Sequence, residues 1–113
     1  MRILIAEDEW LIAMVIERTL MAAGIEVAGK AGAISNALKM IDEARFDAAV
    51  LDANLGGASA EPVALALRSK QIPFLVISGY SSHQGAGVLA EAPFLAKPFA
   101  LGQLLAMVRE LTA

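Results

Sequence analysis

Several polar side chains fall where short apolar runs of the sequence end, and their types suit one kind of chemistry. Glu7 and Asp8 end the first apolar run, Asp52 ends the third, and Ser78 and Lys97 follow the last two. Carboxylates that converge raise one another's pKa values unless a cation joins them, and oxygen ligands of this hardness suit Mg²⁺ better than zinc or copper. A carboxylate nucleophile, a hard cation, a lysine and a hydroxyl together suit phosphoryl transfer.

The elements that must position these side chains alternate between two patterns along the chain. Continuous apolar runs of a few residues are typical of strands buried on both faces, and stretches with helical spacing of apolar residues lie between them. This alternation predicts an α/β fold in which helices cover both faces of a parallel sheet. The predicted strands are Ile3–Ala6, Ile25–Ala28, Asp47–Leu51, Phe74–Ile77 and Phe94–Ala96. The predicted helices are Leu11–Ala23, Ile34–Ile41, a helix that Ser59 can cap and that runs to about Ser69, Ser81–Glu91 and Leu101–Leu111.

The direction of the strands determines where these polar side chains meet. In an open parallel sheet, ligands bind beyond the carboxyl ends of the strands. We therefore expect the acidic pair, Asp52, Ser78 and Lys97 to share one edge of the sheet. The predicted helix before Glu91 is short and weak, because Gly85 and Gly87 each cost about 1 kcal/mol in a helix relative to Ala.

The composition disfavours several other classes of protein. The chain has 113 residues, a net charge of −3, no Cys and one His, His83. The sequence therefore lacks the residues needed for a disulfide scaffold, thiol catalysis, a His-cluster metal site or direct nucleic-acid binding. No apolar segment approaches the roughly 20 residues of a membrane helix, and the acids after residue 6 interrupt any signal-peptide core. We expect a cytoplasmic protein with no membrane contact, a single domain over 1–113 and no output domain, because the last predicted helix ends near residue 113.

Taken in order, the polar residues resemble the site of a known family. The acidic pair after the first strand, Asp52, Ser78 and the dipeptide Lys97-Pro98 are similar to the motifs of response-regulator receiver domains, the CheY-like family of bacterial two-component signalling. The resemblance covers essentially the whole chain. It implies a doubly wound, flavodoxin-like sheet of five parallel strands in the order 2-1-3-4-5.

The resemblance also assigns roles around the acidic cluster. Asp52 would be the phosphoacceptor that takes a phosphoryl group from a histidine kinase or phosphotransfer protein. Asp8 would bind Mg²⁺ directly together with Asp52, Glu7 would act mainly through water, and Asn54 would offer its backbone carbonyl to the metal.

Further roles follow for the residues of the last two strands. Lys97 would bridge to Asp52 and then to a phosphoryl oxygen, and Ser78 would reorient to hydrogen-bond the phosphoryl group. Phe94 matches the aromatic switch position of the family. The peptide bond between Lys97 and Pro98 is expected to be cis, as is common there.

Some positions depart from the commonest family pattern. Leu55-Gly56 stands where a Met-Pro pair is usual, and Ser78-Gly79-Tyr80 ends the fourth strand. With Phe74, this arrangement is similar to the Phe-Ala-Thr-Gly-Tyr motif of a branch of stand-alone receivers.

Two residues are expected to set how long the phosphoryl group lasts. Asn54 and Tyr80 lie two positions beyond Asp52 and Ser78, where they would flank the water that hydrolyses an aspartyl phosphate. We therefore predict that Tyr80→Ala changes the dephosphorylation rate, which the lifetime of the phosphorylated chain would measure.

The expected function is a signalling switch rather than an enzyme with a separate substrate. Phosphorylation would change the face formed by the fourth helix, the fifth strand and the last helix, and with it the affinity for a protein partner. One alternative is a phosphatase of the haloacid-dehalogenase type, against which Asp52-Ala53-Asn54 lacks a second acid. A flavodoxin-like cofactor binder is another, although the acids after residue 6 would repel a phosphate. The chain could also serve as a receiver-like interaction domain that is not phosphorylated. For a phosphorylated receiver, the sequence leaves three roles open: it could carry a signal, act as a phosphate sink or relay phosphate onward.

Overall fold

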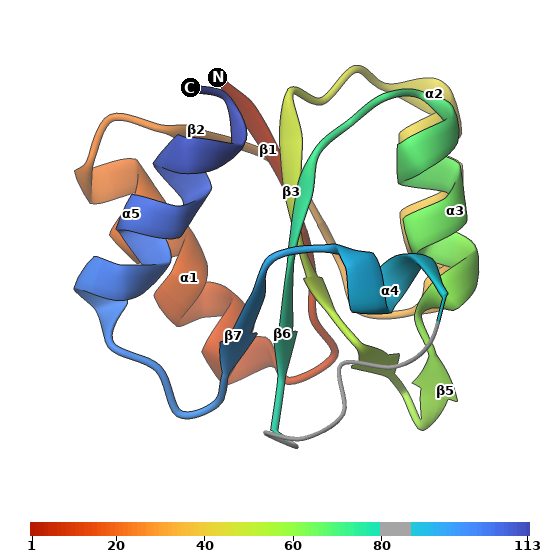
Figure 1. Ribbon diagram of the computed structural model, residues 1–113. Coiled ribbons are helices and arrows are strands. Elements are labelled where there is room, and N and C mark those ends of the chain that lie inside the picture. Colours follow the sequence, from red (N-terminus) through yellow and green to blue (C-terminus); the bar gives the residue numbers. More distant parts are fainter. Residues whose placement is uncertain (80–86) are drawn as a thin grey trace.

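A computed structural model describes residues 1–79 and 87–113 of the chain (Figure 1). The longest helix, α1, has 13 residues. No helix in these two ranges is long and apolar enough to cross a membrane. The elements are β1 (Arg2–Ala6), α1 (Trp10–Ala22), β2 (Glu26–Ala31), α2 (Ile34–Glu43), β3 (Ala48–Asp52), β4 (Asn54–Leu55), β5 (Ala58–Ser59), α3 (Glu61–Ser69), β6 (Phe74–Ser78), α4 (Val88–Glu91), β7 (Phe94–Ala96) and α5 (Leu101–Leu111).

The main sheet has five strands in the order β2-β1-β3-β6-β7, and every neighbouring pair is parallel. β4 and β5 form a separate antiparallel hairpin, so this order is the expected 2-1-3-4-5 counted over the main sheet alone. The doubly wound, flavodoxin-like fold is therefore confirmed. The order reverses between β1 and β3, and a crevice at the carboxyl edge is expected at such a point.

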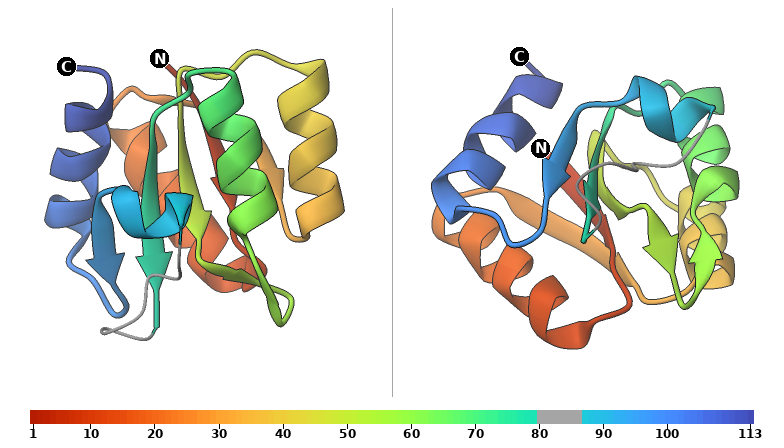
Figure 2. Two further views of the ribbon diagram at one scale, coloured as in Figure 1. Left: turned by 45° about the vertical axis from the view of Figure 1, so that its right-hand side comes forward. Right: turned by 60° about the horizontal axis from the view of Figure 1, so that its bottom comes forward.

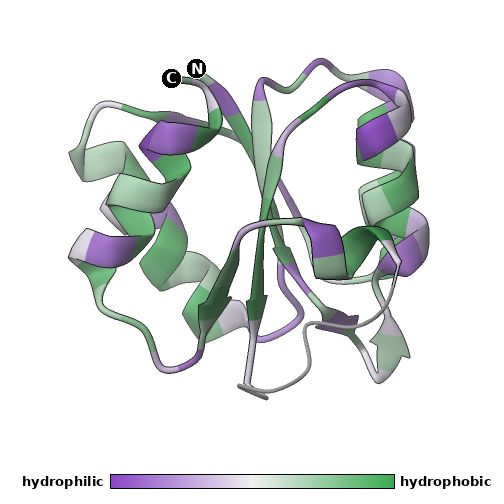
Figure 3. Ribbon diagram, in the orientation of Figure 1, coloured by the Kyte–Doolittle hydropathy of each residue, from purple (hydrophilic) through white to green (hydrophobic). Residues whose placement is uncertain are grey.

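Helices cover both faces of the sheet, with α1 and α5 on one side and α2, α3 and α4 on the other (Figures 1 and 2). Side chains that alternate along a strand enter opposite cores, as Ile3 and Ile5 do toward one face and Leu4 and Ala6 toward the other. All four are buried. The central strands are strongly apolar along their length (Figure 3), which is why continuous apolar runs predicted them.

The predicted bounds of the second strand are wrong for an identifiable reason. The second strand runs over Glu26–Ala31 rather than Ile25–Ala28, because it pairs with β1 as far as Ala31. Its polar and glycine residues hid it, yet Gly29 leaves room that Phe46 and Met40 fill, since a Cβ there would meet both at 3.3 Å.

The third helix begins at Glu61, and Ser59, which the sequence predicted as its cap, pairs with Asn54 in the β4–β5 hairpin. Ser59 still supports the helix start, since its Oγ accepts the Glu61 N–H at 3.2 Å. In the predicted fourth helix, Val88–Glu91 is helical, and residues 80–86, which include Tyr80, His83 and Gly85, lie outside the described residues.

Candidate functional site

The carboxyl ends of four neighbouring strands bring the predicted polar residues together. Glu7 and Asp8 follow β1, Asp52 ends β3, Ser78 ends β6 and Lys97 follows β7. A cavity of about 560 Å³ opens at this edge. Its lining consists of Asp8, Glu9, Asp52, Asn54, Gly57, Ser78, Gly79 and Lys97.

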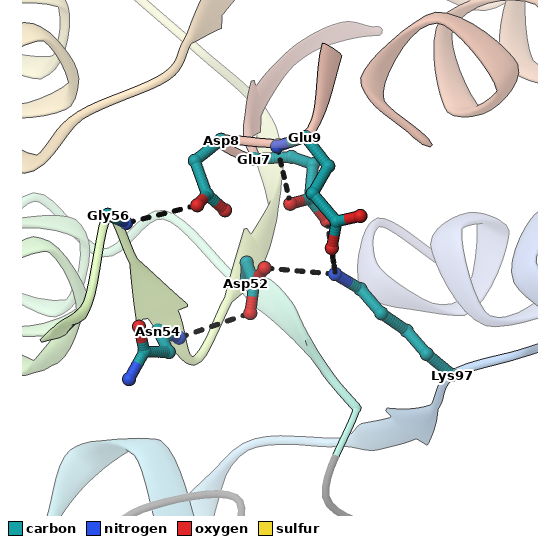
Figure 4. Close-up of polar contacts among 7 residues, drawn as sticks. All are labelled: Glu7, Asp8, Glu9, Asp52, Asn54, Gly56 and Lys97. Carbon is teal, nitrogen blue, oxygen red and sulfur yellow. Dashed lines mark hydrogen bonds and ion pairs between the residues drawn. The ribbon is translucent and has the colours of Figure 1, made fainter. Parts of the chain in front are cut away.

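The Lys97 ammonium lies between two buried carboxylates (Figure 4). Its Nζ is 2.7 Å from Oε1 of Glu7 and 3.0 Å from Oδ2 of Asp52, and its side chain is 13% exposed. Burial lowers the pKa of Lys97, but the hydrogen bonds and charges of Glu7 and Asp52 outweigh burial, and the net shift is upward. Lys97 is therefore a permanent cation here, and we call Lys97, Glu7 and Asp52 the rim cluster.

Burial raises the pKa of Glu7 from 4.5 to about 7. The hydrogen bond from Lys97 lowers this pKa, the neighbouring Asp52 raises it, and the Glu9 N–H, which donates to Glu7 Oε2 at 3.1 Å, lowers it. One ammonium thus compensates two buried carboxylates incompletely. A further cation at this edge would complete the charge balance.

The three acids form a donor set that fits a hard divalent cation. Carboxylate oxygens of Glu7, Asp8 and Asp52 all lie within 4.8 Å of one another, and Asp8 is exposed to solvent while the other two are buried. Oxygen ligands of this kind suit Mg²⁺. Asn54 lines the same cavity, and its N–H donates to Asp52 Oδ1 at 3.1 Å, which orients the carboxylate of Asp52.

The β4–β5 hairpin orients the third acid, Asp8. Gly56 and Gly57 have φ values of 60° and 86°, the left-handed conformations that a two-residue hairpin turn requires. The Gly56 N–H donates to Asp8 Oδ2 at 3.2 Å. The Gly-Gly dipeptide was the signal from which this hairpin could have been predicted.

The other predicted residues lie around this core of the site. Ser78 is 3% exposed and lines the cavity, and its backbone carbonyl accepts the Lys97 N–H at 2.7 Å. Phe94 is partly buried and packs against the core on the α2, α3 and α4 side of the sheet. The Lys97–Pro98 peptide bond is cis. Tyr80 lies outside the described residues.

Glu9 is a site residue that sequence reasoning missed. Its carboxylate lies 3.6 Å from Lys97 Nζ, and it lines the cavity. Its position directly after the acidic pair was the available signal. Because its side chain is 64% exposed, solvent screens its charge far more than that of Glu7.

Comparison with known proteins gives a consistent family. The family model of the response regulator receiver domain matches residues 3–109. The solution structure of SdrG from Sphingomonas melonis Fr1 is 35% identical with a TM-score of 0.85, covering 99% of this chain and 96% of that one. The structure of TrrA from Thermotoga maritima in complex with Mg²⁺-BeF is 26% identical with a TM-score of 0.86, covering 97% of each chain.

Curated relatives are longer proteins. The transcriptional regulatory protein PdtaR of Mycobacterium tuberculosis is 30% identical over 99% of this chain and 60% of its own length. The transcriptional regulatory protein PrrA of the same organism is 36% identical over 97% of this chain and 49% of its own length. The chain therefore spans about half to three fifths of the length of these curated relatives.

Proposed function

The chain belongs to the family of response regulator receiver domains of two-component systems, and from this premise we propose that it is a phosphoacceptor switch whose acceptor is Asp52. The observation that carries the proposal is the Asp52 carboxylate at the wall of an open cavity, with one oxygen on Lys97 and the other on the Asn54 N–H. A carboxylate oriented from both sides, beside a fixed ammonium, is suited to accept a phosphoryl group.

Mg²⁺ is the proposed cofactor. Glu7, Asp8 and Asp52 would hold it, with Asn54 contributing its backbone carbonyl. Bound there, the ion would neutralise charge on the phosphoryl oxygens as the group transfers. The incomplete compensation of Glu7 and Asp52 by Lys97 supports this assignment, and so does TrrA, a relative solved with Mg²⁺-BeF.

Lys97 and Ser78 are proposed to respond to the phosphoryl group. Phosphorylation adds about −1.5 to −2 charge at Asp52, close to the ammonium of Lys97. Lys97 would then bind a phosphoryl oxygen and Ser78 would donate its hydroxyl. Phe94, two residues before the end of β7, would follow this rearrangement and alter the face formed by α4, β7 and α5. Asn54 and Tyr80 would set the rate of hydrolysis.

The proposed partners are a histidine kinase or phosphotransfer protein that supplies the phosphoryl group, and a downstream protein that binds the α4–β7–α5 face. We propose that the chain acts in the cytoplasm as a single receiver domain over 1–113, without binding nucleic acid or membrane. Its chemistry is limited to its own phosphorylation and dephosphorylation. It has no separate substrate to turn over.

Incubation with acetyl phosphate and Mg²⁺, followed by intact mass measurement, tests this function. The wild type is expected to gain one phosphoryl group, and Asp52→Ala is expected to gain none. Asp42→Ala removes an exposed carboxylate on α2 and is the matched control. A wild type that gains no phosphoryl group, or an Asp52→Ala variant that still gains one, would contradict the proposal.

A further inference from the structure

Glu61, the first residue of α3, contacts the start of α4 with its side-chain carboxylate. Its Oε1 accepts the N–H of Val88, the first residue of α4, at 3.2 Å in a partly buried position. Its Oε2 is buried and has no hydrogen-bond partner within the described part of the chain. The Glu61 N–H is held in turn by Ser59 Oγ at 3.2 Å. One side chain therefore links the starts of two helices.

Gly87 has the backbone that this contact requires. Its φ of 60° and ψ of −127° are strongly disfavoured for residues with a Cβ. A Cβ at this position would lie 2.5 Å from Oε1 and 3.3 Å from Cδ of Glu61. The carboxylate can approach the start of α4 only because residue 87 has no side chain.

The contact lies between the candidate site and the surface proposed for a partner. On one side, Glu61 follows the β4–β5 hairpin, which begins beside Asp52 and is closed by a hydrogen bond from the Ala60 N–H to the Ala53 carbonyl at 2.9 Å. On the other side, α4 leads directly into β7, after which Lys97 follows. Figure 2 shows α3 and α4 neighbouring each other on one face of the sheet, so the contact joins the segment after Asp52 to the segment before Lys97.

We propose that Glu61 is a positioning residue that holds the start of α4 against α3 while Asp52 is unphosphorylated, and thereby sets the arrangement of the α4–β7–α5 face. This inference rests on the proposed function. The buried Oε2 of Glu61 has no hydrogen-bond partner among the described residues, which is unfavourable, so a state that releases the contact and hydrates this oxygen relieves that cost. The contact therefore belongs to the unphosphorylated state, and its removal favours the phosphorylated one.

Hydrogen exchange at the Val88 amide tests the contact itself. Glu61→Ala is expected to speed this exchange ~10-fold, while the amides of α5 keep their rates. Glu61→Gln retains a side-chain oxygen that accepts the Val88 N–H and is expected to restore most of the protection. Glu91→Ala is the matched control, because it removes the same charge together with an exposed α3–α4 ion pair, that of Glu91 with Arg68, whose side chains are 69% and 60% exposed. Equal exchange in Glu61→Ala and Glu91→Ala would overturn the inference.

The affinity for beryllofluoride with Mg²⁺ tests the consequence for switching. Glu61→Ala is expected to bind this phosphoryl mimic ~5-fold more tightly than the wild type, as is Gly87→Ala, which displaces the carboxylate from the other side. Glu61→Gln and Glu91→Ala are expected to stay within about twofold of the wild type. Thermal unfolding establishes that each variant folds. If Glu61→Ala does not fold, the comparison of Gly87→Ala with Glu61→Gln tests the inference.

Acetyl phosphate separates this inference from the function on which it rests. If the wild type gains no phosphoryl group, the proposed function fails, whatever the exchange at Val88. If Asp52 is phosphorylated in every variant while Glu61→Ala and Gly87→Ala bind beryllofluoride like the wild type, the switch proceeds without Glu61 and only the further inference is overturned.

Discussion

The rim cluster and the ion pairs on the outside of the molecule have similar geometry but very different surroundings. Lys97 lies 2.7 Å from Glu7 and 3.0 Å from Asp52, and Lys30 lies 2.8 Å from Glu17. The Lys97 side chain is 13% exposed and that of Glu7 is 0% exposed, whereas that of Lys30 is 48% exposed. Distance alone thus does not distinguish a structural pair from a reactive site, because the loss of water makes charge costly only in the rim cluster.

Removing the cation gives the largest expected difference between the two regions. Lys97→Met leaves two buried carboxylates without their ammonium and is expected to lower the free energy of unfolding by ~3 kcal/mol. Lys30→Met at the exposed pair is expected to lower it by less than ~1 kcal/mol. Urea unfolding in a metal-free buffer measures both. Similar losses in the two variants would mean that burial does not set the strength of the rim cluster.

The pH dependence of stability is the next largest effect. Burial raises the pKa of Glu7 from 4.5 to about 7. Between these two pH values Glu7 keeps its proton in the folded chain and loses it in the unfolded chain. Protonated Glu7 therefore contributes its full stabilisation below about pH 4.5, and this contribution, at most ~3 kcal/mol, is lost as the pH rises to about 7. The unfolding free energy of Glu7→Gln is expected to lack this decline.

Urea unfolding of the wild type and Glu7→Gln at several pH values, in the presence of a chelator, measures this difference. Glu26→Gln, which removes an acid that is 59% exposed, is the control and is expected to change the unfolding free energy by less than ~0.5 kcal/mol. A decline that persists unchanged in Glu7→Gln would show that another group causes it.

Metal binding is expected to stabilise the folded chain by a smaller amount. Mg²⁺ at about ten times its Kd adds ~1.4 kcal/mol to the unfolding free energy if it binds only the folded state. Asp8→Ala is expected to abolish this gain, because it removes the exposed acid of the donor set. Trp10, which is 74% exposed and lies two residues from Asp8, provides a fluorescence signal for the titration. Equal Mg²⁺ stabilisation in Asp8→Ala would remove Asp8 from the proposed metal site.

The smallest expected effect is at the outer pair of Arg2 and Glu26, which are 3.0 Å apart with side chains 43% and 59% exposed. A double-mutant cycle of Arg2→Ala and Glu26→Ala is expected to give a coupling energy below ~0.5 kcal/mol that falls as salt is added. Thermal or urea unfolding provides the four free energies. A coupling as large as the effect of Lys97→Met would remove the contrast between the two regions.

The sequence by itself determined the fold class, the strand order expected from the family, and the edge of the sheet where Asp52 and Lys97 meet. These follow from local patterns, because buried strands are continuous apolar runs and parallel strands end on the same side. Asp52 and Lys97 could be paired in this way although 45 residues separate them.

Only the tertiary structure decided which acids are buried and what they contact. Glu7 rather than its neighbour Asp8 lies against Lys97, Glu9 reaches the cavity, and Glu61 contacts Val88. Adjacent residues of a loop have no fixed period that assigns one side chain to the interior and the next to solvent. The direction of each side chain depends on packing between segments that are distant in sequence, and that packing exists only once the strands and helices have assembled.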